Sequence, residues 1–128
     1  MLNAADLDIP FAMNVMAVTR EFLRKNPDTV ERVVKAYIEA VGAMNHDREA
    51  TLKVLAKYFK RNDASFLDET YAIATKFTEK IPRVDRRNGA TVLEFEPVKG
   101  VDAESLTAKV IDNSMVDKLV KEGFIEKV

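Results

Sequence analysis

The stretch RKNPDTVERVVKAYIEAV, residues 24–41, decides the fold because it carries the signals of a well-formed helix. Asn26 is suited to cap its start, and Pro27 stands at the first helical position, where its missing N–H costs nothing. Asp28 places a negative charge at the positive end of the helix dipole. One apolar stripe follows, formed by Val30, Val33, Val34, Tyr37, Ile38 and Val41. We expect a helix that runs to about Met44 and buries this stripe.

Two further helices are expected downstream, each behind an aspartate that can cap it, Asp47 and Asp63. Pro82 closes this part of the chain, because proline cannot continue a helix. Residues 26–82 are therefore predicted to be helical. The side chains expected to face inward are Leu52, Leu55, Ala56 and Phe59 in one helix and Leu67, Tyr71, Ala74 and Phe77 in the other.

The segment before the first helix is predicted to contain a strand. Residues 1–10 look irregular, and the run FAMNVMAVT, residues 11–19, is apolar on both alternating faces, which is typical of a buried strand. Asn14 is its one polar interior residue, and a buried amide needs hydrogen-bond partners. Those partners are either backbone groups or a ligand at the end of the strand. Asn14 is therefore the candidate ligand-binding residue.

Residues 83–101 are predicted to form a linker or a short strand. Their first half is polar and contains an Asn-Gly turn signal, and TVLEFE, residues 91–96, alternates between apolar and polar side chains. This segment separates the first helical part of the chain from the second.

Residues 102–128 are predicted to be helical again. One helix is expected from Asp102 to Ile111, and a last one ends at Gly123. Leu119 and Phe124 occupy the positions where a Schellman cap makes its hydrophobic contact. The expected fold class is mainly α with one or two short strands, in a single domain of residues 1–128.

Composition excludes several functional classes. The chain has 128 residues, of which 47% are hydrophobic and 32% charged, and its net charge is -1. This balance argues against a nucleic-acid partner, which selects for a basic excess, and against a membrane-surface protein. The absence of cysteine excludes disulfides and thiolate chemistry. The first residues, MLNAADLDIPF, lack the basic start and apolar core of a signal peptide, so the chain as written carries none.

The reactive side chains suggest no catalytic grouping. His46 is the single histidine, and a metal site would need further ligands beside it. Arg83, Arg86 and Arg87 form a basic cluster that either contacts an anion or lies in solvent. Neither phosphate-binding glycine motif is present. We therefore expect no enzyme activity, no catalytic residue, no metal and no cofactor.

Two stretches read together resemble a known family. VTREFLRKNPDTVERVVKAYIEAV, residues 18–41, resembles the segment of ABC-transporter substrate-binding proteins in which a strand leads into a long helix. DNSMVDKLVKEGFIEKV, residues 112–128, is similar to their usual ending. The helical region between them also fits, so the resemblance covers about residues 8–128. The nitrate/sulfonate/taurine type is the most similar.

The resemblance implies a fold and a function. It implies the C-terminal fragment of a two-lobed α/β protein of the type II periplasmic-binding-protein fold, which thiamine-pyrimidine synthases share. It also implies a solute-binding component of an ABC importer, whose partners are a small organic or anionic solute and a membrane permease. The location would be periplasmic or extracytoplasmic if a signal peptide precedes the sequence. An unpaired apolar strand at residues 11–19 would further promote self-association of the isolated chain.

Two alternatives remain open. One is a fragment of an enzyme similar to the thiamine-pyrimidine synthases, for which the single His46 is a poor match. The other is a free-standing helical protein-interaction domain, which requires residues 11–19 to be helical or buried among helices.

Overall fold

The computed structural model describes residues 14–128, and over this range the chain forms seven α-helices and one short 3-10 helix. In chain order they are α1 (Arg20–Lys25), α2 (Pro27–His46), α3 (Arg48–Phe59), α4 (Ala64–Phe77), α5 (Arg86–Phe95), α6 (Ala103–Val110), α7 (Ser114–Lys121) and η2 (Ile125–Lys127).

The predicted α/β character is wrong, because residues 14–128 contain no strand. Residues 14–19 of the first predicted strand are irregular, and Val15, Met16 and Val18 are each more than half exposed. Residues 11–13 of that strand and the segment 1–10 lie outside the described residues. A strand needs a neighbour to pair its backbone N–H and C=O groups, and the described chain offers none. The type II periplasmic-binding-protein fragment implied by the resemblance is therefore not the fold of this chain.

The second predicted strand, residues 91–96, lies almost wholly within helix α5, so the predicted linker contains a helix. Asp85 caps this helix, since its carboxylate accepts a hydrogen bond from the backbone N–H of Arg87 at 2.8 Å. α5 packs against α6, and Gly89 lies against Thr107 of that helix. The tertiary contact with α6 outweighs the local alternation that suggested a strand.

The other predicted helices are present, but α4 ends at Phe77 and not near Pro82, so residues 78–82 are not helical. Phe59 and Phe77, which were predicted to face inward, are 51% and 43% exposed. Asp47, Asp63 and Asp102 cap α3, α4 and α6, each accepting a hydrogen bond from a backbone N–H in the first turn. Asn26 precedes Pro27 as expected but makes no capping bond through its side chain.

Helix α7 ends in the predicted Schellman motif. Gly123 adopts φ +66, the backbone N–H of Phe124 donates to the carbonyl of Leu119 at 3.0 Å, and that of Gly123 donates to Val120 at 3.0 Å. Phe124 packs against the cluster that contains Leu119. The chain therefore turns sharply here and brings η2 back toward α2.

The hydrophobic core is small and lies where α7 and η2 pack on α2. Its buried residues are Val34, Ile38, Val116, Leu119 and Ile125. Ile38 and Leu119 are fully buried. The predicted stripe of α2 is only partly covered, because Val33 and Tyr37 are exposed.

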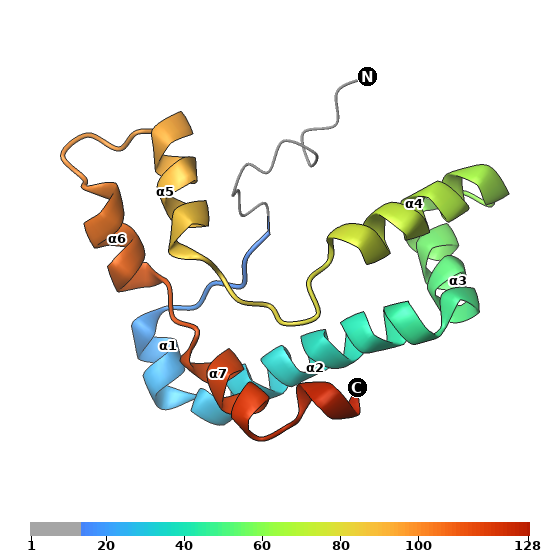
Figure 1. Cartoon of the computed structure of the whole chain (residues 1–128), viewed down its shortest axis with the longest axis horizontal. Helices are drawn as coiled ribbons and strands as arrows, with labels where there is room; N and C mark the ends of the chain where they lie inside the picture. Colours follow the sequence, from blue (N-terminus) through green and yellow to red (C-terminus); the bar gives the residue numbers. More distant parts are fainter. Residues whose placement is uncertain (1–13) are drawn as a thin grey trace.

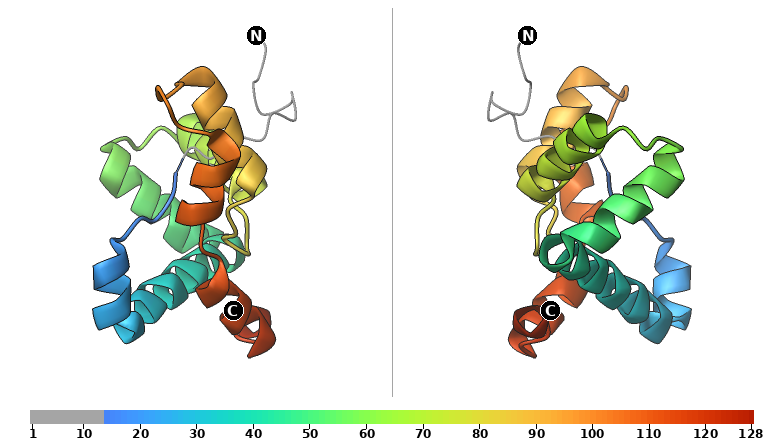
Figure 2. Two further views of the ribbon diagram at one scale, coloured as in Figure 1. Left: turned by 90° about the vertical axis from the view of Figure 1, so that its left-hand side faces the viewer. Right: turned by 90° about the vertical axis from the view of Figure 1, so that its right-hand side faces the viewer.

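Two helical pairs extend from this centre as arms. Figure 1 shows α3 and α4 paired at one end of the molecule and α5 and α6 paired at the other, with α2 and α7 between them. The perpendicular views in Figure 2 show the same open arrangement. Arg20 donates to the backbone carbonyl of Lys109 at 2.6 Å and so ties α1 to α6. No helix in the described range is both long enough and apolar enough to cross a membrane.

Candidate functional site

The structure does not place Asn14 in the environment that suggested it as a ligand-binding residue. Asn14 is exposed and lies in the irregular segment before α1, so its amide does not have to find a buried partner. Its role in ligand binding therefore stays a prediction without a pocket to support it. His46 is the last residue of α2 and is also exposed.

The arginine cluster lies beside a shallow surface concavity of about 490 Å³. Its lining residues are Glu79, Arg83, Val84, Asp85, Arg87, Asn88 and Asn113. Two arginines of the predicted basic cluster form ion pairs with carboxylates. Arg83 pairs with Asp117 at 2.5 Å, and Arg87 pairs with Asp85 at 2.7 Å. The hydrogen bond from the Arg87 side chain is the main cause that lowers the pKa of Asp85. These internal pairs compete with binding of an external anion.

Asn113 is a residue whose role was missed in the sequence. Its side-chain oxygen accepts from the backbone N–H of Val84 at 3.0 Å, and its side-chain N–H donates to the Val84 carbonyl at 3.0 Å. It therefore fastens the segment before α5 to the start of α7. The available signal was the polar run Asp112-Asn113-Ser114 between two predicted helices.

Asp112, next to Asn113, stabilises the turn before α7 by accepting a hydrogen bond from the backbone N–H of Ser114 at 2.9 Å. Hydrogen bonds from the hydroxyl and the backbone N–H of Ser114 lower the pKa of the Asp112 carboxyl. The polar run thus stabilises the fold through Asp112 and joins distant segments through Asn113.

A network of charges crosses from α2 to α7 next to the core. Glu31 accepts from Lys118 at 2.7 Å and from Lys35 at 2.6 Å. The hydrogen bonds from Lys118 first and Lys35 second lower the pKa of Glu31 to about 2. The same contact with Glu31 is the main cause that raises the pKa of Lys118.

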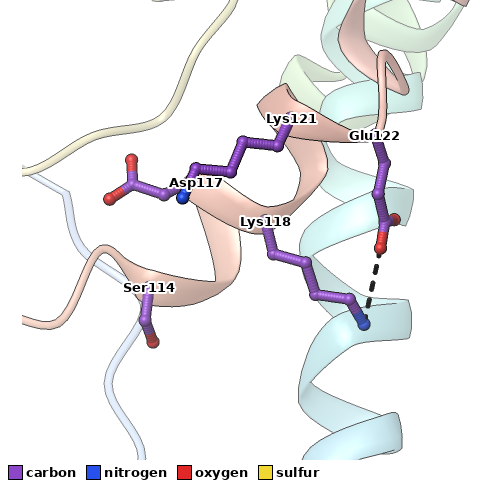
Figure 3. Close-up of a pocket in the computed structure, with 5 residues that line it drawn as sticks. All are labelled: Ser114, Asp117, Lys118, Lys121 and Glu122. Carbon is purple, nitrogen blue, oxygen red and sulfur yellow. Dashed lines mark ion pairs between the residues drawn. The ribbon is translucent and has the colours of Figure 1, made fainter.

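Figure 3 shows the second concavity, of about 470 Å³, along the exposed side of α7. It is lined by Ser114, Asp117, Lys118, Lys121 and Glu122. Lys118 also lies 3.9 Å from Glu122 across one helical turn. All the lining side chains come from one helix and its cap, so this is a charged surface rather than an enclosed ligand site.

The described residues assemble no metal centre. In residues 14–128 no three side chains of His, Cys, Asp or Glu converge in a way that could hold an ion. The polar groups brought together here have structural roles: they cap helices, fasten a loop and join α2 to α7.

Compared with known proteins, the chain matches no protein family, no curated protein and no solved structure.

Proposed function

We propose that this chain is the C-terminal helical portion of the solute-binding component of an ABC importer for a small organic or anionic solute. Its partners would be that solute and a membrane permease, it would act outside the cytoplasm, and it would carry out no catalysis. The proposal rests on the resemblance of residues 18–41 and 112–128 to such proteins. It does not extend to a two-lobed α/β architecture, because residues 14–128 form no strand.

The packing of the two resembling stretches against each other is the observation that carries the proposal. Val34 and Ile38 lie in the first stretch, and Leu119 and Ile125 lie in the second; all four belong to one core cluster. The ion pair between Glu31 and Lys118 also joins the two stretches. Residues 18–41 and 112–128 therefore pack against each other. The two stretches that resemble the family form one connected part of the molecule.

An antibody raised against residues 112–128 tests this proposal. Cell fractions are separated into cytoplasm and exported material and are probed by immunoblot. We expect a band well above 14.4 kDa in the exported fraction, which would then be purified and screened with nitrate, sulfonates and taurine by thermal shift. A band at 14.4 kDa confined to the cytoplasm contradicts the importer function.

A free-standing helical protein-interaction domain is the second candidate. The entirely helical course of residues 14–128 favours it, as do the exposed apolar side chains on both arms. On α3 and α4 these are Val54, Tyr58, Phe59, Ile73 and Phe77. The cytoplasmic outcome of the immunoblot would make this candidate the working hypothesis.

A further inference from the structure

The turn that joins α3 to α4 combines exposed aromatic rings with positive charge. We call residues 57–63, the end of α3 and the connection to α4, the basic turn; its sequence KYFKRND contains three cationic residues and one acidic residue, Asp63, a net charge of +2. Tyr58 is 76% exposed and Phe59 is 51% exposed. Arg61 is held with its guanidinium 4.1 Å from the centre of the Phe66 ring. This end of the molecule therefore presents aromatic surface framed by cations.

The turn that joins α5 to α6 has the opposite charge. We call residues 94–104 the acidic turn; it contains Glu94, Glu96, Asp102 and Glu104 against a single lysine, a net charge of -3. Val98 and Val101 are 53% and 42% exposed. Within residues 14–128, the three glutamates form no ion pair with any other side chain. This end therefore presents apolar surface framed by carboxylates.

The surface area of the chain is too large for a compact monomer. The chain exposes 9961 Å². A compact protein of 14.4 kDa exposes about 6,800 Å². If about 2,000 Å², the most that residues 1–13 could expose, is subtracted, residues 14–128 still expose about 8,000 Å². A compact protein of their mass exposes about 6,300 Å², so the excess is roughly 1,600 Å². A standard interface buries about 800 Å² on each partner, so the excess is enough for a stable dimer.

We propose that the 128-residue chain forms a closed dimer with twofold symmetry, in which the basic turn of each copy packs on the acidic turn of the other. The two turns lie on opposite arms and on the same side of α2 (Figure 1). A twofold rotation therefore brings unlike turns together at two equivalent contacts, which closes the assembly. Pairing of like turns would place net charges of the same sign against each other, two against two or three against three. The inference concerns the chain itself and does not rest on the proposed importer function.

Sedimentation equilibrium on the whole chain tests the dimer. We expect a mass of twice 14.4 kDa at concentrations from about 10 µM to about 1 mM. Raising the ionic strength from about 0.05 M to about 0.5 M should weaken association at least tenfold, because salt screens the charges of both turns. A monomer throughout this range overturns the proposal, and so does a dimer whose stability ignores salt.

Reversing the charges of one turn at a time tests whether the basic turn of one copy contacts the acidic turn of the other. The basic-turn variant carries Lys57→Glu, Lys60→Glu and Arg61→Glu, and the acidic-turn variant carries Glu94→Lys, Glu96→Lys and Glu104→Lys. Each variant alone should dissociate at least tenfold more readily, because it presents turns of one sign. An equimolar mixture should recover a heterodimer, because every contact then again joins unlike charges.

A control separates this contact from overall charge. Lys80→Glu, Lys121→Glu and Lys127→Glu change the net charge by the same amount at exposed sites outside both turns, and this variant should dimerise like the unmodified chain. Circular dichroism checks that each variant is folded. Folded variants that stay dimeric alone, or that fail to recombine in the mixture, contradict the proposed pairing.

Discussion

Gly89 shows how a single missing side chain allows two helices to pair. A β-carbon built at Gly89 would lie 2.5 Å from the Cγ2 atom of Thr107. Thr107 is only 3% exposed. Glycine costs about 1 kcal/mol of helix stability relative to alanine, so the close contact with α6 is what favours glycine at this position.

We expect Gly89→Ala to lower the free energy of unfolding by about 1 kcal/mol, since the strain of overpacking exceeds the gain in helix propensity. Urea unfolding followed by circular dichroism measures the change. Thr107→Ser removes the clashing methyl group and keeps the hydroxyl that donates to the carbonyl of Ala103 at 2.9 Å. The double variant should regain the lost stability; if it does not, the clash is not the cause.

Asn113 is the residue that joins two segments 29 positions apart. Replacing it with alanine removes both hydrogen bonds to Val84, and we expect a loss of about 1–3 kcal/mol in the free energy of unfolding. Asn113→Asp keeps the acceptor for the Val84 N–H but sets a carboxylate oxygen against the Val84 carbonyl, so at neutral pH it too should be less stable than the unmodified chain. Asn62→Ala, at an exposed position, serves as the control and should be close to neutral. Equal stability of Asn113→Ala and the control would refute the fastening role.

At the scale of the elements, the contact between α2 and α7 depends on pH through Glu31. The folded chain lowers the pKa of Glu31 from 4.5 to about 2, so the unfolded chain binds its proton more readily than the folded chain does. The stabilisation is therefore complete above about pH 5 and is lost as the pH falls toward 2. We expect the urea midpoint to decline across this window, and to decline less steeply in Glu31→Gln. Parallel pH profiles of the two proteins would show that Glu31 is not responsible.

Helix α5 explains why residues 91–96 were misread at the element scale. The alternation of TVLEFE is a local signal, and it was outweighed by the cap from Asp85 and by packing against α6. Thr91, a β-branched residue that favours strands, is accommodated because its hydroxyl donates to the carbonyl of Arg87 at 3.0 Å. The sequence of residues 91–96 contains no local signal that α6 will pack against this segment.

At the scale of the whole molecule, stability depends on a core of few side chains. Leu119 is fully buried at the contact of α7 with α2. Leu119→Ala should cost about 3 kcal/mol, a large part of the roughly 5–15 kcal/mol that holds a typical domain together. Thermal unfolding measures the loss. Val54→Ala, at a position that is 52% exposed, should change the stability by less than about 0.5 kcal/mol. Similar losses for the two variants would mean that the α2–α7 contact is not the main core.

Local signals in the sequence predict most of the helices and several of their ends; helix α5 and the end of α4 at Phe77 are the exceptions. Pro27 at a helix start, the capping aspartates and the glycine stop at Gly123 act within one turn of the backbone, and the structure confirms them. The candidate site was less accessible to sequence reasoning. Asn14 was selected because a strand was expected around it, whereas Asn113 acts through a partner 29 residues away.

Tertiary structure alone decided which apolar faces are covered. Val34 and Val33 look equivalent in the sequence, yet the first is buried by α7 and the second is 52% exposed. It also decided that residues 91–95 are helical and that turns of opposite charge lie on opposite arms. The physical reason is that burial and pairing require a partner surface. That surface comes from segments distant in the chain, whose arrangement no local pattern encodes.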